Sequence, residues 1–379
     1  MNQISGAHKM FDNVIIGGGV MGLWAARHAA ARGESVLLLE KNTVGSGASG
    51  GFLGALMPHM PDGWDEKKAF QYHGLSTLGE VVAGLEAETG IDCGYKQCGR
   101  IMPMVHEAMR NHETIRTEGA QKFWDEPFKL EMIESDFYRS YMSDWMDIDL
   151  AEFGVQVDTL SARINPRAYV KALIVSLKDK VVVREKTNVI QFVSHGAGGA
   201  SVTMDDNETI SAGRVIVANG WEAYELLQPF MNDMNNGRSI GRGVKGQAVL
   251  VEHEHNDDLP IVYHDGVFVV PHKGNRVAIG STSISDWQDE PNPSPNSFDL
   301  KNMGFYHSAL KFVPALGDSQ IIERWAAVRP RNTIGGLGTD PYFAPVPDCP
   351  SIFALIGGFK VTLGIAHLDH IANPYPNEI

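Results

Sequence analysis

Residues 11–40 read FDNVIIGGGVMGLWAARHAAARGESVLLLE, and this stretch decides the fold class. Its apolar run at 14–16 is typical of a strand that is buried on both faces. The alanine-rich stretch at 23–32 predicts a helix that ends at Gly33. A second apolar run at 36–39 predicts another buried strand. Strand, helix and strand in this order predict a βαβ unit within a parallel sheet.

The glycines between the first strand and the helix follow the spacing GxGxxG. Gly17 allows the tight turn, Gly19 lets the backbone approach a pyrophosphate, and Gly22 lets the helix pack closely on the strand. The N-terminus of the helix directs its free N–H groups at the phosphates. Glu40, which ends the second strand, is placed to accept hydrogen bonds from ribose hydroxyls, and an acid here argues against a 2′-phosphate. The stretch therefore predicts a dinucleotide site; a purely structural glycine turn is the alternative.

Two further glycine-rich segments favour FAD over NAD. The loop GSGASGGFLGA at 45–55 offers backbone N–H groups for a second pass over a long dinucleotide. Near the other end of the chain, an apolar strand at 352–356 runs into two glycines and a predicted helix at 361–371. The N-terminus of that helix suits the negative charge that develops on a flavin when it is reduced. A cofactor contacted by both ends of the chain is more typical of FAD.

Composition excludes several other classes of protein. The 379 residues are 43% hydrophobic and 21% charged, which is typical of globular domains, and the length predicts about two or three of them. The formal charge of −14 disfavours nucleic-acid partners and anionic membranes. Three cysteines cannot form a disulfide framework, and no Cys/His cluster has zinc spacing, so we expect no metal site. Since we find neither a signal-peptide pattern nor an apolar run of membrane-spanning length, we expect a cytoplasmic protein.

The remaining chain mixes helices and strands. Asn165-Pro166 predicts a helix start, with asparagine as the N-cap and proline as the first helical residue. We also predict helices at 66–90 and 301–313, strands at 181–193, 214–218 and 321–328, a β-meander at 246–283, and an exposed loop at 288–297.

The motifs together resemble the D-amino-acid-oxidase (DAO) family of FAD enzymes, and within it the glycine oxidase and sarcosine oxidase branch. The resemblance covers nearly the whole chain in the family's order, through VIIGGGVMG, LLLE, GSGASGGFLGALMPH, KGQAVLVE, DGVFVVPHKGNRVAIGST, WAAVRPR and GGFKVTLGIAH. It implies an α/β protein with a Rossmann-like FAD-binding domain and a second domain, α+β, built on an antiparallel substrate sheet. The implied FAD-binding domain is discontinuous, from 10–95, 155–232 and 320–379, and the substrate domain takes 96–154 and 233–319.

The resemblance also implies the chemistry. A hydride leaves the carbon next to the amine of a small amino acid or N-methyl amino acid, and the resulting imine is hydrolysed by water. The electron acceptor is oxygen, which gives hydrogen peroxide, or a quinone. The expected partners are therefore small molecules, and a homo-oligomer is compatible with the family.

Family position assigns most of the cofactor contacts. Besides Gly17, Gly19 and Gly22, the residues expected to line FAD are Val20, Met21, Glu40, Lys41, Ala48, Ser49, Leu53, Gly54, Ala55, Val189 through its backbone, Gly220, Gly358, Phe359, Lys360, Val361, Thr362, Leu363, Gly364 and Ile365. Sarcosine oxidases tether their flavin through a cysteine in the region where this chain has Val328-Arg329-Pro330. Because no cysteine lies there, we predict that FAD is bound non-covalently.

Arg329 is the strongest candidate for binding substrate. It lies in AAVRPR, where glycine oxidase has an arginine that binds the substrate carboxylate. A planar, bidentate guanidinium suits that role, since it both holds the carboxylate and orients the carbon that is oxidised. The alternatives are a structural arginine at a strand end, or Arg331 in its place.

Other candidates have structural readings beside the functional ones. Lys360 pairs with a carboxylate, stabilises reduced flavin, or is solvated at a helix start. His59 lies near the flavin or packs its loop. Tyr263 and Phe268 form a wall around the substrate amine or belong to the core. Alternation puts these two aromatic residues on opposite faces of a continuous strand, unless the HDG turn between them interrupts it.

Three other functions are kept as alternatives. Oxidation of a 2-hydroxy acid would use the same carboxylate clamp and a histidine base, for which His59, His264 and His272 are candidates. The loop SGGFLGALMP also resembles the flavin domain of a bifunctional enzyme that modifies the wobble uridine of transfer RNA, although the negative charge argues against it. Finally, the chain could be the flavin subunit of a hetero-oligomeric amine dehydrogenase.

Overall fold

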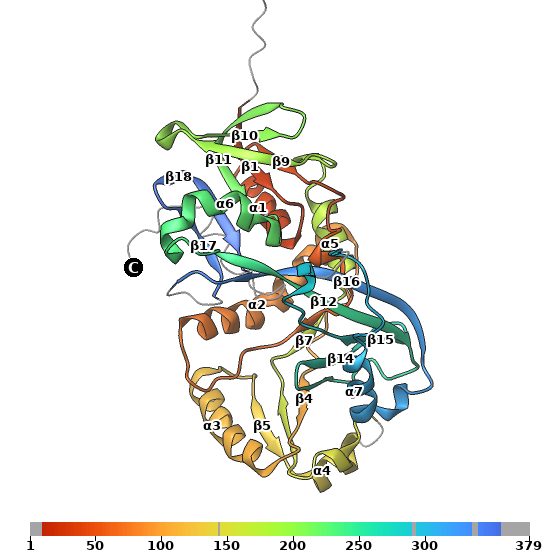
Figure 1. Ribbon diagram of the computed structural model, residues 1–379. Helices are drawn as coiled ribbons and strands as arrows, with labels where there is room; N and C mark the ends of the chain where they lie inside the picture. Colours follow the sequence, from red (N-terminus) through yellow and green to blue (C-terminus); the bar gives the residue numbers. More distant parts are fainter. Residues whose placement is uncertain (1–9, 143–144, 290–292, 336–339, 358–379) are drawn as a thin grey trace, which may run out of the picture. The chain divides into compact units, whose positions relative to one another are not determined.

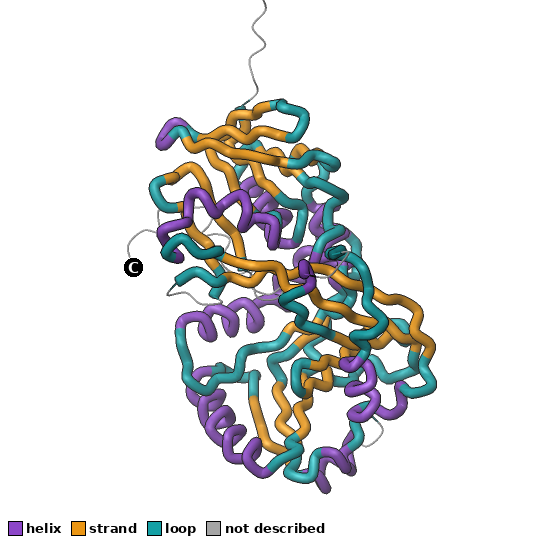
Figure 2. The backbone as a smooth tube through the Cα atoms, in the orientation of Figure 1, coloured by secondary structure: helices purple, strands orange, loops and turns teal. Residues whose placement is uncertain are grey.

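The computed structural model describes residues 10–142, 145–289, 293–335 and 340–357 (Figures 1 and 2). The chain divides into two compact units. The first takes 1–50, 170–243 and 329–379, and the second takes 51–169 and 244–328. The first unit is thus made of three separate segments and the second of two.

Residues 51–95 and 155–169, which we expected in the FAD-binding domain, belong to the second unit. They do so because β3 (Ala55–Leu56) pairs with β7 (Ala162–Arg163) inside that unit. The guanidinium of Arg163 also donates to the carbonyl of Pro271 in β14 (Val267–His272), which ties β7 to the main sheet of the second unit.

The sheet of the first unit forms around the βαβ segment and combines parallel and antiparallel pairs. Its strand order is β17-β18-β11-β1-β2-β8, and β10 joins β11 to β9. The bounds are β1 (Phe11–Ile16), β2 (Val36–Leu39), β8 (Val182–Arg184), β9 (Val189–Ser194), β10 (Ala200–Met204), β11 (Thr209–Val217), β17 (Tyr342–Val346) and β18 (Cys349–Ile356). Parallel pairing of β1 with both β2 and β11 confirms the predicted buried strands and brings their carboxyl ends to one edge.

Alternation along β1 separates the two faces of this sheet. Val14 and Ile16 face a core completed by α6 (Ala223–Met231), whereas Ile15 lies beneath Gly22 of α1 (Val20–Ala31). Cover on both faces is what the continuous apolar runs of β1 and β2 require. Helix α1 begins three residues before its predicted start, at the glycine motif itself.

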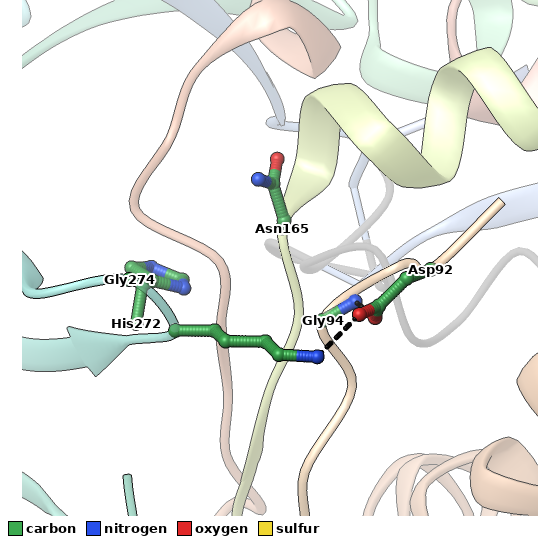
Figure 3. A pocket seen from close by; sticks show the side chains of 6 residues that line it. Asp92, Gly94, Asn165, His272 and Gly274 are labelled. Carbon is green, nitrogen blue, oxygen red and sulfur yellow. Dashed lines mark hydrogen bonds and ion pairs between the residues drawn. The ribbon is translucent and has the colours of Figure 1, made fainter. Parts of the chain in front are cut away.

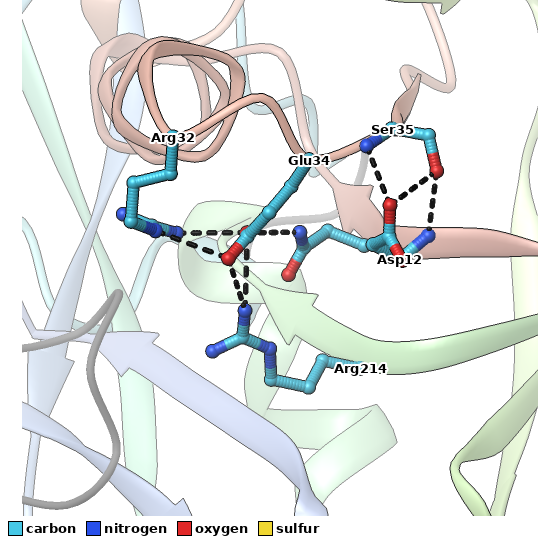
Figure 4. A network of polar contacts seen from close by, with 6 residues as sticks. Asp12, Arg32, Glu34, Ser35 and Arg214 are labelled. Atoms are coloured by element: carbon cyan, nitrogen blue, oxygen red, sulfur yellow. Dashed lines mark hydrogen bonds and ion pairs between the residues drawn. The ribbon is translucent and has the colours of Figure 1, made fainter.

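A polar network fastens the turn after α1 at the amino ends of the strands (Figure 4). The backbone N–H of Ser35 donates to Asp12 Oδ2 at 2.7 Å. Glu34 accepts from Asn13 Nδ2 at 2.6 Å and from Arg214 Nη2 at 3.0 Å. The network links β1, β11 and the start of β2, so the opposite edge of the sheet is left for the glycine loop.

The predicted strand at 181–193 is wrong as one element. It divides into β8, which pairs with β2, and β9, which pairs with β10. Between them, Lys186 has a φ of +54°. A left-handed residue breaks the extended pattern, so the chain leaves one edge and begins a separate antiparallel ribbon.

The sheet of the second unit has the order β16-β12-β15-β14-β13-β4-β6-β5. Its other strands are β4 (Arg100–Pro103), β5 (Leu130–Ile133), β6 (Val155–Asp158), β12 (Gly241–Glu252), β13 (Ile261–His264), β15 (Arg276–Gly280) and β16 (Gln320–Asn332). The expected meander holds for β13, β14 and β15, but β12 pairs with β15 instead of β13. A second, mostly antiparallel sheet is thus present, with a different neighbour for the first strand of the meander and with one parallel pair, β13 and β4.

The two faces of this sheet have different covers. One face packs against α4 (Ser135–Met142) and α7 (Gly304–Phe312). The other carries an apolar cluster with Phe52, Met57 and Trp325. Helices α2 (Glu66–Thr89) and α3 (Glu107–Phe123) complete the unit.

The predicted helix starts and ends agree closely with the structure. Asn165 Oδ1 accepts from the N–H groups of Arg167 and Ala168, so it caps α5 (Pro166–Ser176) as expected. Helices α2 and α7 match the predicted ones, and the predicted helix at 361–371 lies outside the described residues. In the described part of the chain, no helix is both long enough and apolar enough to cross a membrane.

Candidate functional site

The glycine motif forms a turn that only glycine can occupy. Gly17 has a φ of +106°, and a Cβ there would lie 2.6 Å from the Cα atom of Asn219. A Cβ on Gly22 would lie 1.9 Å from the carbonyl oxygen of Gly17. The first and third glycines therefore perform the roles that the motif predicts: the tight turn and the close packing of α1 on β1.

Glu40 lies directly against this turn. Its Oε2 atom accepts from the N–H of Gly18 at 2.7 Å, and its Oε1 atom accepts from the N–H of Asn42 at 2.8 Å. The carboxylate is thereby held at the carboxyl ends of β1 and β2, which is where dinucleotides bind in parallel sheets.

The first part of the glycine-rich loop returns to the same place. Gly45 donates to the carbonyl of Gly18 at 2.9 Å, and Ser49 Oγ accepts from the N–H of Val20 at 3.0 Å. Ser49 and Ala48 share one short 3-10 turn, Ala48–Gly50. The structure thus brings the predicted residues of 45–50 to the N-terminus of α1.

Two more segments of the first unit join this group. The N–H of Thr187 donates to the carbonyl of Glu40 at 2.9 Å, two residues before Val189. The segment after β11 also contacts this group. Its Glu222, two residues beyond Gly220, has Oε1 3.2 Å from Nζ of Lys41. The glycine turn, Glu40, Lys41 and the 48–49 turn therefore lie at one edge of the sheet, while the predicted residues at 358–365 lie outside the described residues.

Asn219 is a residue of this edge to which we assigned no role from the sequence. Its Oδ1 atom is buried and has no hydrogen-bond partner within the described residues. Buried polar atoms are almost always paired, and a cofactor hydroxyl or amide would supply a donor here. With the glycine turn and Glu40, this atom shows that the edge fits a dinucleotide such as FAD. The Asn-Gly pair at the end of a buried strand was the available signal.

The remaining predicted cofactor residues belong to the second unit. Gly54 adopts a φ of +60°, and its carbonyl accepts from the N–H of Ile164 at 3.0 Å. The carbonyl of Leu53 lies 3.1 Å from His272 Nε2. Ala55 begins β3. These contacts fix residues 53–55, which we call the 53–55 loop, on the β14 side of the sheet.

Tyr263 and Phe268 lie on the same face of that sheet. They are direct cross-strand partners in the β13–β14 hairpin, with ring centroids 4.9 Å apart. Between the strands, Asp265 and Gly266 have φ values of +44° and +79°, the pattern of a tight two-residue turn. The turn reverses the chain, so the opposite-face expectation for a continuous strand does not apply. Both rings join the cluster that contains Leu53 and Ala55.

The histidines considered as bases have other contacts. His264 lies on the opposite face, where its ring packs on that of Phe312, with the two ring centroids 4.5 Å apart. Desolvation lowers its pKa. His272 lies beside Leu53, and desolvation lowers its pKa to about 4. For His59, the structure shows a backbone N–H that donates to Oε1 of Gln71 in α2.

Arg329 occupies the interior of β16, because the strand continues to Asn332 beyond its predicted end. The residue as a whole is exposed, although protein atoms surround its guanidinium. Desolvation by neighbouring protein atoms and then repulsion from Arg331 lower the pKa of its guanidinium. Arginine still remains a cation, and two neighbouring cations favour an anionic ligand.

A buried ion pair on the 53–55 side of the second sheet was not predicted. Arg100 Nε donates to Asp158 Oδ2 at 2.6 Å, with side chains only 3% and 0% exposed. The guanidinium lies 5.9 Å from the ring centroid of Tyr263. Since the two ions are 58 residues apart, no local pattern pairs them.

A separate cavity of about 210 Å³ lies at the end of β14 (Figure 3). Its lining residues are Asp92, Gly94, Asn165, His272, Lys273 and Gly274. Lys273 Nζ bonds to Asp92 Oδ2 at 2.6 Å, so its charge is already compensated. Among the described residues, no group of His, Cys, Asp and Glu is arranged to hold a metal ion.

Known proteins match this chain along most of its length. The glycine oxidase of Geobacillus kaustophilus is 26% identical over 373 residues, which cover 92% of this chain and 88% of that protein. The glycine oxidase of Bacillus subtilis is 25% identical over 370 residues, covering 93% and 89%. The crystal structure of the Geobacillus enzyme aligns with a TM-score of 0.82 at 21% identity, covering 97% of this chain and 96% of that one, so the two share a fold.

The family model described as FAD dependent oxidoreductase (DAO) matches residues 12–368. This match confirms the predicted FAD cofactor, and together with the shared fold it confirms the predicted α/β architecture with a Rossmann-like domain. The chain therefore belongs to the DAO family of FAD-dependent oxidoreductases.

Proposed function

We propose that this enzyme oxidises a small amino acid or an N-methyl amino acid with non-covalently bound FAD. The observation that carries the proposal is Arg329, an exposed residue of β16 with a partly desolvated guanidinium, in the unit that holds the glycine motif. The glycine oxidases that resemble this chain support a substrate of this class. The absence of cysteine at 328–330 supports non-covalent binding.

In this proposal Arg329 binds the substrate carboxylate. A guanidinium offers two parallel N–H donors to a carboxylate, which fixes both the position and the rotation of the amino acid. Orientation of this kind lowers the barrier, since the carbon that loses hydride is held in place before the reaction. Bound FAD supplies the hydride acceptor, and the product imine is hydrolysed by water.

Tyr263 and Phe268 provide an apolar wall beside the substrate amine. Their rings, tilted against each other on one sheet face, exclude water and favour the neutral amine, which can lose a hydride, over the ammonium ion, which cannot. Oxidation of a neutral amine needs no general base, so the sheet can lack one. We propose oxygen as the electron acceptor, with a quinone as the alternative.

The histidine contacts disfavour the 2-hydroxy-acid alternative. That reaction needs a base to remove the hydroxyl proton. His264 packs on Phe312 on the other face, and His272 uses Nε2 to contact a carbonyl. His264 therefore lies away from Tyr263 and Phe268, and the pKa of His272, lowered to about 4, makes it a weak base.

An anaerobic reduction screen tests the proposal. Purified enzyme with FAD is mixed without oxygen with glycine, sarcosine, D-amino acids, proline and 2-hydroxy acids, and the absorbance of oxidised flavin is followed. We expect at least one amine to reduce the flavin, and re-admission of oxygen to restore it with release of hydrogen peroxide. Reduction by hydroxy acids alone would contradict the amine assignment, and slow reoxidation in oxygen would favour a quinone.

A further inference from the structure

His272 makes a buried polar contact with the 53–55 loop. Its Nε2 atom lies 3.1 Å from the carbonyl oxygen of Leu53, and the residue is only 8% exposed. A carbonyl oxygen can only accept, so Nε2 carries the hydrogen and donates it. The imidazole is therefore held in one tautomer.

The surroundings keep this imidazole neutral. Desolvation is the main cause of a pKa lowered to about 4, and the guanidinium of Arg163 adds to it. A neutral ring with Nε2–H is thus the form present at neutral pH. Because charge is disfavoured here, the contact does not depend on protonation.

The backbone of the 53–55 loop packs directly against the imidazole. A Cβ on Gly54 would lie 3.1 Å from His272 Cε1 and 1.9 Å from the carbonyl oxygen of Ile164. Pairing of β3 with β7 fixes the chain just after Gly54, whereas His272 holds it just before. His272 is also one of the residues that line the cavity at the end of β14, and Figure 3 shows it close to Gly274. The loop thus has an anchor on each side of its left-handed glycine.

We propose that His272 is a positioning residue for FAD, which acts by fixing the carbonyl of Leu53 and with it the conformation of the 53–55 loop. The proposal rests on the proposed function, since it takes Leu53, Gly54 and Ala55 as part of the FAD site. It assigns His272 a role that is neither catalytic nor merely apolar packing. Without the Nε2 donor, the loop samples other conformations and FAD has to select the bound one.

Two substitutions separate the hydrogen bond from the volume of the side chain. In His272→Gln the amide nitrogen can occupy the place of Nε2 and donate to Leu53. In His272→Asn the shorter amide reaches only the place of Nδ1 and cannot. His253→Asn is the matched control, because His253 makes its side-chain contact with Ser319 instead of the 53–55 loop.

The measurements are the dissociation constant of FAD from the apo-protein and hydrogen exchange of a peptide containing residues 53–57. In His272→Asn we expect FAD to bind about tenfold more weakly, equivalent to about 1.4 kcal/mol, and the peptide to exchange faster. His272→Gln is expected to stay within about threefold of the wild type, or about 0.7 kcal/mol, and His253→Asn to leave both readouts unchanged.

Wild-type affinity and exchange in His272→Asn would overturn the proposal. Equal losses in the glutamine and asparagine variants would also overturn it, since the imidazole would then act through packing alone. If the wild-type apo-protein takes up no FAD, the proposed function fails instead. The exchange comparison on the apo-protein still tests the anchor in that case.

Discussion

Phe268 lies directly opposite Tyr263 across the β13–β14 hairpin, and their ring centroids are 4.9 Å apart. The pair occupies the face of the second sheet that also carries Leu53 and Ala55. A tight turn through Asp265 and Gly266 creates this arrangement. Two residues that are five positions apart in the sequence therefore form one apolar surface.

Replacement of Phe268 by alanine tests whether this surface contacts substrate. We expect kcat/KM for the best amine to fall about tenfold, equivalent to about 1.4 kcal/mol, because the wall loses one of its two rings. Steady-state kinetics measures the effect. Phe305→Leu, in the core on the other face, is the control for general loosening of the sheet. Equal losses in both variants would count against a substrate wall.

Replacement of Arg329 by methionine tests the carboxylate clamp. We expect kcat/KM to fall about 100-fold or more, since a charge-assisted pair is worth about 2–5 kcal/mol when one partner is removed. Arg329→Lys should recover only part of the loss, because an ammonium cannot bind in a bidentate manner. Arg331→Met is the control two residues along the same strand. A greater loss in the Arg331 variant would reassign the clamp to that residue.

The substitution Gly22→Ala should abolish FAD binding. The added methyl group would lie 1.9 Å from the carbonyl oxygen of Gly17, so the turn that carries the phosphate site has to open. Gly84→Ala in α2 is the matched helical control, because nothing lies within 4 Å of a Cβ there. The control is expected to bind FAD normally and to gain about 0.5–1 kcal/mol in stability. Titration with FAD and thermal unfolding check both expectations.

Asp158→Asn should destabilise the second unit strongly. It leaves Arg100 as a buried charge without its counter-ion, which costs about 3–5 kcal/mol. Glu208→Gln breaks the partly exposed pair with Arg184 and should cost about 1 kcal/mol or less. Chemical denaturation compares the two variants. Similar small effects would mean that water or a neighbouring group compensates Arg100.

Acid should destabilise the protein partly through His272. Its pKa is lowered to about 4, so the folded protein binds fewer protons there than the unfolded chain, whose histidine pKa is about 6.5. The contribution of this pKa difference to the free energy of unfolding is complete above about pH 6.5, and it is lost as the pH falls towards about 4. We expect the difference in unfolding free energy between wild type and His272→Gln to shrink over this range. An unchanged difference would show that His272 does not titrate in this window.

Local patterns in the sequence predicted the elements of the first unit well. Continuous apolar runs identified β1 and β2, and the glycine spacing identified the turn before α1. The Asn165-Pro166 pair identified the start of α5, because an N-cap needs only two or three neighbouring residues. These features depend on short-range sterics and hydrogen bonds, which the sequence displays directly.

Features that depend on pairing across the chain could not be read in this way. The segment 181–193 looked like one strand, yet the left-handed Lys186 sends its two halves to different neighbours. Contacts between distant segments likewise decide that β12 pairs with β15 and that Arg100 forms an ion pair with Asp158. Periodicity describes which side of an element is apolar, but not which element will cover it.

The sequence by itself determined the class of protein: a Rossmann-like unit with a glycine turn, an acid at the end of the second strand, and an FAD cofactor. Only the tertiary structure decided which candidate residues share a surface. In the structure Tyr263 lies opposite Phe268, and His264 lies on the other face of the sheet. The Nε2 atom of His272 is hydrogen-bonded to the carbonyl oxygen of Leu53. The reason is physical: backbone turns and strand register set the direction of each side chain, and a single reversal changes the face on which it lies.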